Sequence, residues 1–167
     1  MKGGFINSKQ YQKDIEEVLR LSLPWESLNG KNILVTGATG LICSFLVDVL
    51  MLNPNRNYQL YVVGRNEQTA HQRFFSFWED SSFHFNRQDL QGERKCGMGF
   101  HYIIHGAGNA FPKMFSTDPI GTLYGTIEGT RNLLEYASKH QTERFIYISS
   151  AEVYGSGEQP IWHEDDC

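Results

Sequence analysis

An apolar segment, a glycine turn and an apolar helix follow one another early in the chain, and this order constrains the fold most. Residues 31–36 (KNILVT) are typical of a buried strand, and Gly37 to Gly40 form a tight turn after it. Residues 41–52 (LICSFLVDVLML) predict a helix, which Pro54 ends. In this context a glycine turn indicates dinucleotide binding, because backbone N–H groups and a helix N-terminus can meet a pyrophosphate.

The rest of the chain alternates between segments with strand and helix patterns. Further strands are expected at 58–63, 82–86, 100–105 and 144–149. Helices are expected at 8–22, 67–78 and 120–140, and a polar, glycine-rich loop at 91–99. This alternation predicts an α/β fold with a doubly wound parallel sheet covered on both faces. Together with the glycine turn, it indicates an NAD(P)-binding Rossmann fold. We expect an N-terminal helical extension at 1–29 and the Rossmann domain, truncated, at 30–167.

The composition of the chain limits which binding partners and which cellular compartment are expected. The net charge of -4 and a pI near 5.8 argue against nucleic acid or an anionic membrane as a partner. The N-terminus has no apolar run typical of a signal peptide, and no stretch is long enough to span a bilayer. The three cysteines (Cys43, Cys96 and Cys167) form no CxxC pair, so a reducing cytoplasm is expected.

Six short motifs carry a resemblance to a known family. They are TGATGLIC at 36–43, GR at 64–65, QDL at 88–90, HGAG at 105–108, GTRNLLEYA at 129–137 and ISSAEVYG at 148–155. In these motifs the chain resembles the extended short-chain dehydrogenase/reductases, specifically the nucleotide-sugar epimerases and dehydratases, over about residues 30–166. The resemblance implies NAD or NADP as cofactor and a nucleotide sugar as substrate, and the C-terminal part of the fold is missing from this chain.

The resemblance also implies which residues hold the cofactor. They are Gly37, Ala38, Thr39, Gly40, Leu41 and Ile42 at the pyrophosphate, Asp89 and Leu90 at the adenine, and Gly106, Ala107 and Gly108 beside the ribose and nicotinamide. The Asp89 carboxylate would accept a hydrogen bond from the adenine amino group; the alternative for Asp89 is an ordinary loop carboxylate.

The end of the second strand bears on the choice between NAD and NADP. Gly64 stands where NAD-specific members of the family place an acid, and Arg65 and Asn66 follow it. We assign Arg65 and Asn66 to the cofactor site, and the Arg65 guanidinium favours NADP because it suits a 2′-phosphate. Stacking of Arg65 on adenine, or a solvated side chain, are the alternatives.

Two residues match catalytic positions of the family. Ser150 matches the Ser/Thr that hydrogen-bonds the sugar oxygen at the reacting carbon, and Glu152 matches a base of some dehydratases and decarboxylases. Ala151 replaces the acid of 4,6-dehydratases, which leaves epimerase, decarboxylase or reductase chemistry. The family's Tyr and Lys, four residues apart, occur nowhere in the chain and would be expected just beyond Cys167, so the chain is expected to be inactive alone.

Two further positions depart from the family's pattern. Cys43 replaces the third fingerprint glycine and is expected to be a buried thiol, and Thr126 replaces an Asn that is usual in the long helix. The remaining candidates are expected to pack or to be solvated rather than to bind a metal or a base: His101, His105, His140, Phe74, Phe75, Phe77 and Trp78.

Three hypotheses remain open. The first is the NAD(P)-binding portion of a nucleotide-sugar epimerase/dehydratase-type oxidoreductase that acts by transient hydride transfer. The second is a non-catalytic module that binds a dinucleotide, and the third is a truncated, inactive gene product. In each case the last strand would present an unpaired edge and apolar faces, so self-association of the chain is expected.

Overall fold

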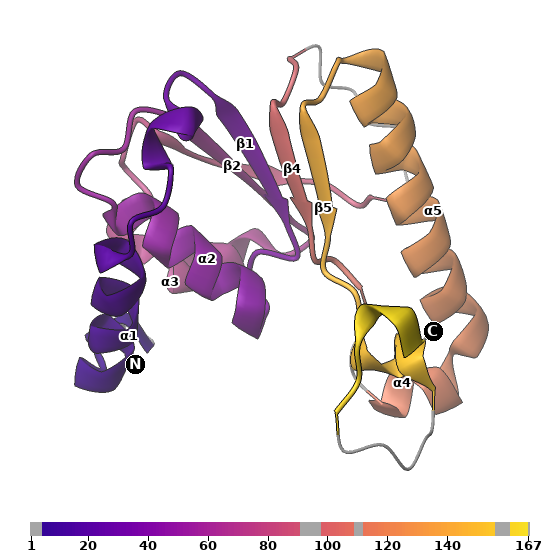
Figure 1. Ribbon diagram of the computed structural model, residues 1–167. Coiled ribbons are helices and arrows are strands. Elements are labelled where there is room, and N and C mark those ends of the chain that lie inside the picture. The colour runs from indigo at the N-terminus through magenta and orange to yellow at the C-terminus, as the bar shows by residue number, and fades with distance from the viewer. Residues whose placement is uncertain (1–4, 91–97, 109–111, 156–160, 167) are drawn as a thin grey trace.

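The computed structural model describes residues 5–90, 98–108, 112–155 and 161–166, and within them five strands form one parallel sheet (Figure 1). The order across the sheet is β3-β2-β1-β4-β5. The strands are β1 (Asn32–Thr36), β2 (Gln59–Gly64), β3 (Phe83–Arg87), β4 (Tyr102–His105) and β5 (Arg144–Tyr147). The chain reverses its direction of winding between β3 and β4, so the predicted doubly wound α/β fold is confirmed.

Five α-helices accompany the sheet in the described residues. They are α1 (Lys9–Arg20), α2 (Leu41–Leu52), α3 (Glu67–Arg73), α4 (Pro112–Thr117) and α5 (Pro119–Lys139). The expected helix at 67–78 is wrong in its second half, because α3 ends at Arg73 and a separate 3-10 turn covers Phe75–Phe77. Helix α4 was not predicted, and most of the loop expected at 91–99 lies outside the described residues.

Helices cover both faces of the sheet, and each layer has its own core (Figure 1). On one face, Ile33 and Val35 of β1 pack in a cluster with side chains of α2, including Val47 and Met51. On the other face, Leu34 of β1 packs in a cluster with Phe100, Ile103, Leu133 and Tyr136. Adjacent β1 residues thus face opposite helical layers, which explains why Ile33, Leu34 and Val35 in the middle of the strand are all apolar.

The aromatic cluster after α3 belongs mainly to this interior. Phe74 and Phe77 are buried in the core that α2 shares, and Trp78 packs against that core. Phe75 departs from the expectation, because 57% of its surface is exposed. The expectation that this cluster packs on the sheet is therefore confirmed for three of its four rings.

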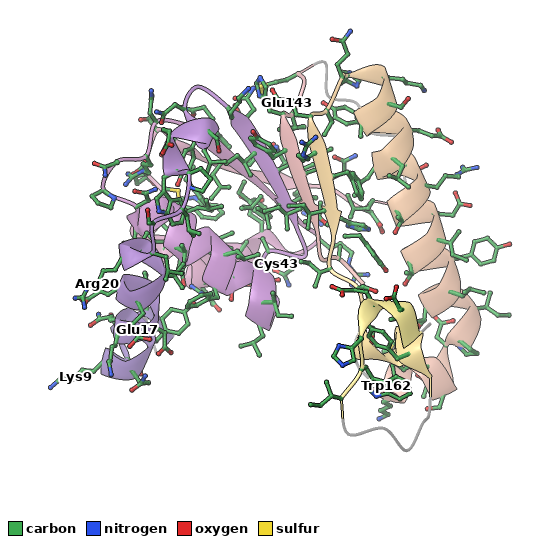
Figure 2. The ribbon with its side chains drawn as sticks, in the orientation of Figure 1. Lys9, Glu17, Arg20, Cys43, Glu143 and Trp162 are labelled. Carbon is green, nitrogen blue, oxygen red and sulfur yellow. The ribbon has the colours of Figure 1, made fainter. Side chains whose placement is uncertain are left out.

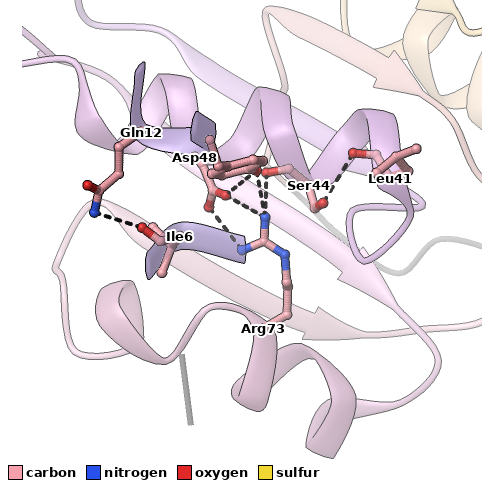
Figure 3. A network of polar contacts seen from close by, with 7 residues as sticks. Ile6, Gln12, Leu41, Ser44, Asp48 and Arg73 are labelled. Atoms are coloured by element: carbon pink, nitrogen blue, oxygen red, sulfur yellow. Dashed lines mark hydrogen bonds and ion pairs between the residues drawn. The ribbon is translucent and has the colours of Figure 1, made fainter. Parts of the chain in front are cut away.

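The first helix is joined to the domain through a buried ionic network (Figure 3). The Tyr11 hydroxyl donates to Asp48 Oδ2 at 2.6 Å, and Arg73 donates to both carboxylate oxygens of Asp48. Arg73 also donates to the Ser44 carbonyl oxygen at 3.3 Å. One carboxylate thus links α1, α2 and α3.

In the part of the chain that the structure describes, no helix is long and apolar enough to cross a membrane.

Candidate dinucleotide-binding site

The turn after β1 has the backbone geometry that its glycines predict. Gly37 has φ +66°, in the left-handed region where a Cβ is strained. The Gly40 N–H donates to the Gly37 carbonyl at 2.9 Å, and Gly40 then occupies the N-cap of α2. Since Gly40 has no side chain, the N-terminal amides of α2 are open to an approaching anion.

A second turn, at the end of β4, lies against the first. A Cβ added to Gly37 would be 2.4 Å from the Gly106 carbonyl oxygen and 2.7 Å from the Ala107 nitrogen. The Gly106 N–H donates to the Thr36 carbonyl at 3.2 Å. We call Gly37, Gly40 and Gly106 the glycine cradle. Contact with rigid backbone means that position 37 tolerates no side chain.

Cys43 completes the cradle from the helix side (Figure 2). A Cβ added to Gly106 would lie 2.3 Å from the Cys43 Sγ, so the thiol fills the space beside that glycine. Cys43 is only 3% exposed, as expected, and burial raises the pKa of its thiol. A small buried side chain is thus compatible with the close approach of α2 to the β4 turn.

The other residues of the predicted pyrophosphate motif differ in exposure. Ala38 is buried, whereas Thr39, Leu41 and Ile42 are exposed, Leu41 by 77% and Ile42 by 58%. Leu41 and Ile42 therefore place two exposed apolar side chains on the first turn of α2, directly after Gly40.

Of the two predicted cofactor residues after β2, one caps a helix and the other is exposed to solvent. The Asn66 side chain caps α3, because its Oδ1 accepts from the Thr69 N–H at 3.0 Å. Arg65 is exposed. The end of β2 is hydrogen-bonded to the segment that follows β3, because the Gln88 N–H donates to the Gly64 carbonyl oxygen at 3.1 Å. Arg65 therefore has the freedom to reach a ligand, while Asn66 already has a structural partner.

Leu90 is held against the long helix. The Leu90 carbonyl accepts from Asn132 Nδ2 at 3.0 Å, and its side chain packs in the second core cluster. A Cβ added to Gly129 would lie 3.3 Å from the Leu90 Cβ, so the glycine gives α5 room to approach. Asp89 itself is exposed, at the same carboxyl edge of the sheet as the cradle.

The predicted catalytic pair follows β5 at that edge. The Ile148 N–H donates to the His105 carbonyl at 2.9 Å, which joins the end of β5 to the end of β4. Ser150 is exposed and its Oγ accepts from the Glu152 N–H at 3.2 Å, so the hydroxyl starts a 3-10 turn at Ala151–Tyr154. Glu152 is also exposed. Both side chains are therefore accessible from solvent.

Two features of the described residues were not predicted from the sequence. His105, expected to pack or be solvated, is buried between two threonines next to the cradle, and burial lowers its pKa. A hollow of about 650 Å³ lies elsewhere, near the amino ends of β1, β4 and β5, whereas ligands in open α/β sheets bind at the carboxyl ends of the strands. Within the described ranges no three His, Cys, Asp or Glu side chains are grouped for a metal ion.

Comparison with known proteins agrees with this geometry. The NAD dependent epimerase/dehydratase family matches residues 33–167. UDP-glucuronic acid decarboxylase 1 of Danio rerio is 32% identical over 136 residues, which is 81% of this chain and 31% of the relative. The dTDP-glucose 4,6-dehydratase of Streptomyces griseus is 28% identical over 140 residues, 81% of this chain and 42% of the relative.

A solved structure supports the fold. A double mutant of the dTDP-glucose 4,6-dehydratase DesIV from Streptomyces venezuelae, determined with NAD bound, matches with a TM-score of 0.70 and 21% identity. The match covers 81% of this chain and 44% of that one. The chain therefore spans less than half the length of each of these three relatives.

Proposed function

Since the chain belongs to the NAD dependent epimerase/dehydratase family, we propose that it is the dinucleotide-binding portion of a nucleotide-sugar epimerase/dehydratase-type oxidoreductase. One observation carries the proposal. The turns after β1 and β4 approach so closely at Gly37 and Gly106 that no side chain fits between them. Such a backbone-only surface beside a helix N-terminus suits a pyrophosphate, which needs N–H donors and close approach.

The remaining residues fit a dinucleotide laid across the carboxyl edge of the sheet. The cradle and the first turn of α2 would hold the pyrophosphate, Asp89 and Leu90 the adenine, and Ala107 and Gly108 the nicotinamide side. When bound, NAD or NADP accepts and returns a hydride at a sugar carbon. Ser150 would donate to the sugar oxygen at that carbon, and Glu152 would accept a proton. Epimerase, decarboxylase and reductase chemistry can each start from this arrangement, whereas Ala151 stands where 4,6-dehydratases have an acid.

A titration with NADH and NADPH, followed by nicotinamide fluorescence, tests the binding. We expect Leu41→Asp to weaken binding about tenfold, because it adds negative charge where the pyrophosphate would lie. Leu41 is exposed, so the variant should fold. Leu52→Asp is the matched control, because it adds the same charge at the other, exposed end of α2.

A pair of glycine substitutions tests the same proposal through the backbone. Gly37→Ala places a Cβ against the Gly106 backbone, whereas Gly30→Ala has a similar positive φ of +69° and nothing within 4 Å. Both variants therefore carry backbone strain, but we expect only Gly37→Ala to abolish binding. Equal binding by all four variants, or none by the unmodified chain, would contradict the proposal.

The second candidate is a non-catalytic dinucleotide binder, favoured by the departures from the family's pattern at Cys43, Thr126 and Ala151. Titration with UDP- and dTDP-sugars separates the two. Binding of a nucleotide sugar that weakens in Ser150→Ala supports the enzyme portion. Retention of the dinucleotide with no nucleotide-sugar binding supports the module.

We also propose which cofactor the chain prefers, where in the cell it is located and which class of partner it does not bind. Arg65 favours NADP within this NAD dependent family, and its exposure leaves it free to reach a 2′-phosphate. A cytoplasmic location remains a prediction from the cysteine pattern, and Cys43 is a free thiol in the structure. Nucleic acid is not an expected partner of this acidic chain.

Self-association is the last part of the proposal. Apolar side chains that are about half exposed or more line α5 and β5: Ile120, Leu123, Tyr124, Ile127, Leu134, Ile146 and Tyr147. Strand β5 is also an edge of the described sheet. Sedimentation velocity over a range of concentrations should show dimers or larger species, and a strictly monomeric chain would contradict this part.

A further inference from the structure

A buried histidine joins three elements next to the glycine cradle. The His105 ring is 1% exposed at the end of β4, and its Nδ1 lies 2.7 Å from Thr36 Oγ1 at the end of β1. Its Nε2 lies 3.0 Å from Thr130 Oγ1 on α5. Thr36 directly precedes Gly37 and His105 directly precedes Gly106, so the ring connects the two residues from which both cradle turns start.

The hydrogen bonds determine which ring nitrogen carries the proton. Thr130 Oγ1 donates its single proton to the Thr126 carbonyl at 2.7 Å, so toward His105 it can only accept. His105 Nε2 is therefore the protonated nitrogen. In a neutral ring Nδ1 is then an acceptor, and it receives the Thr36 hydroxyl proton. Burial lowers the pKa of His105, which favours this neutral form.

The elements around His105 carry two aromatic rings, an ion pair and a thiol. On β5, the rings of Phe145 and Tyr147 lie 6.1 and 5.4 Å from the His105 ring, centroid to centroid. On α5, Glu128 and Arg131 pair with each other at 2.9 Å. On α2, the Cys43 thiol lies against Gly106 and is kept protonated by burial, which raises its pKa.

We propose that His105 is a positioning residue: its neutral ring accepts from β1, donates to α5 and so fixes the spacing of the Gly37 and Gly106 turns that form the cradle. Those turns approach so closely that a change in their spacing would alter the backbone surface that they form. The consequence for binding rests on the proposed function. The geometric part does not, because it can be measured without a ligand.

Two variants and a control separate positioning from general stability. His105→Asn keeps an acceptor, Oδ1, near the place of Nδ1, whereas His105→Leu removes both hydrogen bonds and keeps an apolar filling. Leu133→Ala is the control, because it removes buried volume from α5 at a side chain that is 1% exposed and packs in the core away from the cradle. It should lower the melting temperature at least as much as His105→Leu does.

The first measurement uses the unliganded chain. Nitrogen-15 spectra of the wild-type ring should show the proton on Nε2. Amide exchange of Gly106, taken relative to the core amide of Leu34, should accelerate about tenfold in His105→Leu, little in His105→Asn and not in Leu133→Ala. A proton on Nδ1, or equal relative exchange in His105→Leu and Leu133→Ala, would overturn the proposal.

The second measurement is dinucleotide affinity. We expect His105→Leu to raise the Kd about tenfold and Leu133→Ala to change it less than about twofold. Equal affinities for these two variants would show that His105 contributes only stability, and would overturn its positioning role. If the wild-type chain binds neither NAD nor NADP, the proposed function fails, and the amide exchange of Gly106 still decides whether His105 fixes the cradle.

Discussion

The Tyr11 hydroxyl and the Asp48 carboxylate are 2.6 Å apart, and they join the N-terminal helix to the helix that begins at the glycine cradle. Asp48 is fully buried and is also paired with Arg73. The pKa of Tyr11 is raised, first by burial and then by its bond to this carboxylate. A fully buried carboxylate requires both partners, because an unpaired charge in the interior is costly.

Asp48→Asn should therefore destabilise the fold strongly. Arg73 would lose its counter-charge, so we expect a loss of about 3 kcal/mol or more in the free energy of unfolding. Tyr11→Phe removes one hydrogen bond and should cost about 1–2 kcal/mol. Urea unfolding followed by circular dichroism measures both losses.

Glu17→Gln is the control for this pair. Glu17 lies on the exposed face of α1 in an ion pair with Lys13 at 3.7 Å, so its loss should change stability by less than about 0.5 kcal/mol. Losses of similar size in Asp48→Asn and Glu17→Gln would refute the role given to the buried network.

The contact between Gly106 and Cys43 gives a second prediction. Gly106→Ala should destabilise the fold by about 1–3 kcal/mol, because the new Cβ would overlap the Cys43 Sγ. The double variant Cys43→Ala/Gly106→Ala should recover much of this loss, because the sulfur is removed. Thermal unfolding of the single and double variants measures the coupling.

Gly108→Ala serves as the control for that cycle. An added Cβ at Gly108 meets nothing within 4 Å, so the variant should be close to wild type in stability. Additive losses in the double variant would mean that the sulfur is not what excludes a side chain at Gly106.

The local pattern of the sequence determined much of this fold. The helix expected at 41–52 coincides with α2, because a continuous apolar run stands between Gly40 and Pro54. The helix expected at 67–78 was too long because Phe74 and Phe77 leave the helical path to enter the core. There the burial of these two rings in the core outweighs the helical periodicity of the sequence, and no local sequence pattern predicts this outcome.

Features that depend on distant partners could not be predicted. Asp48 in an apolar helix has partners 37 and 25 positions away, in Tyr11 and Arg73. Similarly, His105 meets Thr36 from 69 positions away and Thr130 from 25. The sequence placed the glycine turns at the right strand ends, but the side chains that hold them together depend on the three-dimensional arrangement of the strands and helices.

Lowering the pH should reduce the free energy of unfolding through the protonation of His105. Burial lowers the pKa of His105 below its ordinary value of 6.5, so the unfolded chain takes up a proton at a pH where the folded chain does not. The stability that the neutral ring contributes is present above pH 6.5 and is lost as the pH falls toward the folded-state pKa. The slope should approach about 1.4 kcal/mol per pH unit within that window.

Comparison with His105→Asn isolates this effect. The variant cannot titrate at that position, so the difference in unfolding free energy between it and the wild type should shrink as the pH falls from 7.5 to 5. The other histidines are common to both proteins and cancel. A difference that stays constant across this range would show that His105 has no perturbed titration.

Cofactor choice can be tested at the end of β2, where the structure leaves room for the residue that the family's NAD-specific members carry. An added Cβ at Gly64 would meet only ordinary contact, 3.4 Å from a Phe85 ring carbon, so Gly64→Asp should fold. Its carboxylate would accept from the ribose hydroxyls of NAD and repel the 2′-phosphate of NADP. We expect the ratio of NADP to NAD affinity to fall about tenfold or more.

Arg65→Ala tests the same choice from the other side. Loss of the guanidinium should weaken NADP binding about tenfold and change NAD binding little, because only NADP carries the 2′-phosphate that Arg65 would bind. Competition between NADPH and NAD in a fluorescence titration gives both affinities in one experiment. An equal loss for the two cofactors would instead assign Arg65 to stacking on the adenine, which NAD and NADP share, and would remove the reason for favouring NADP.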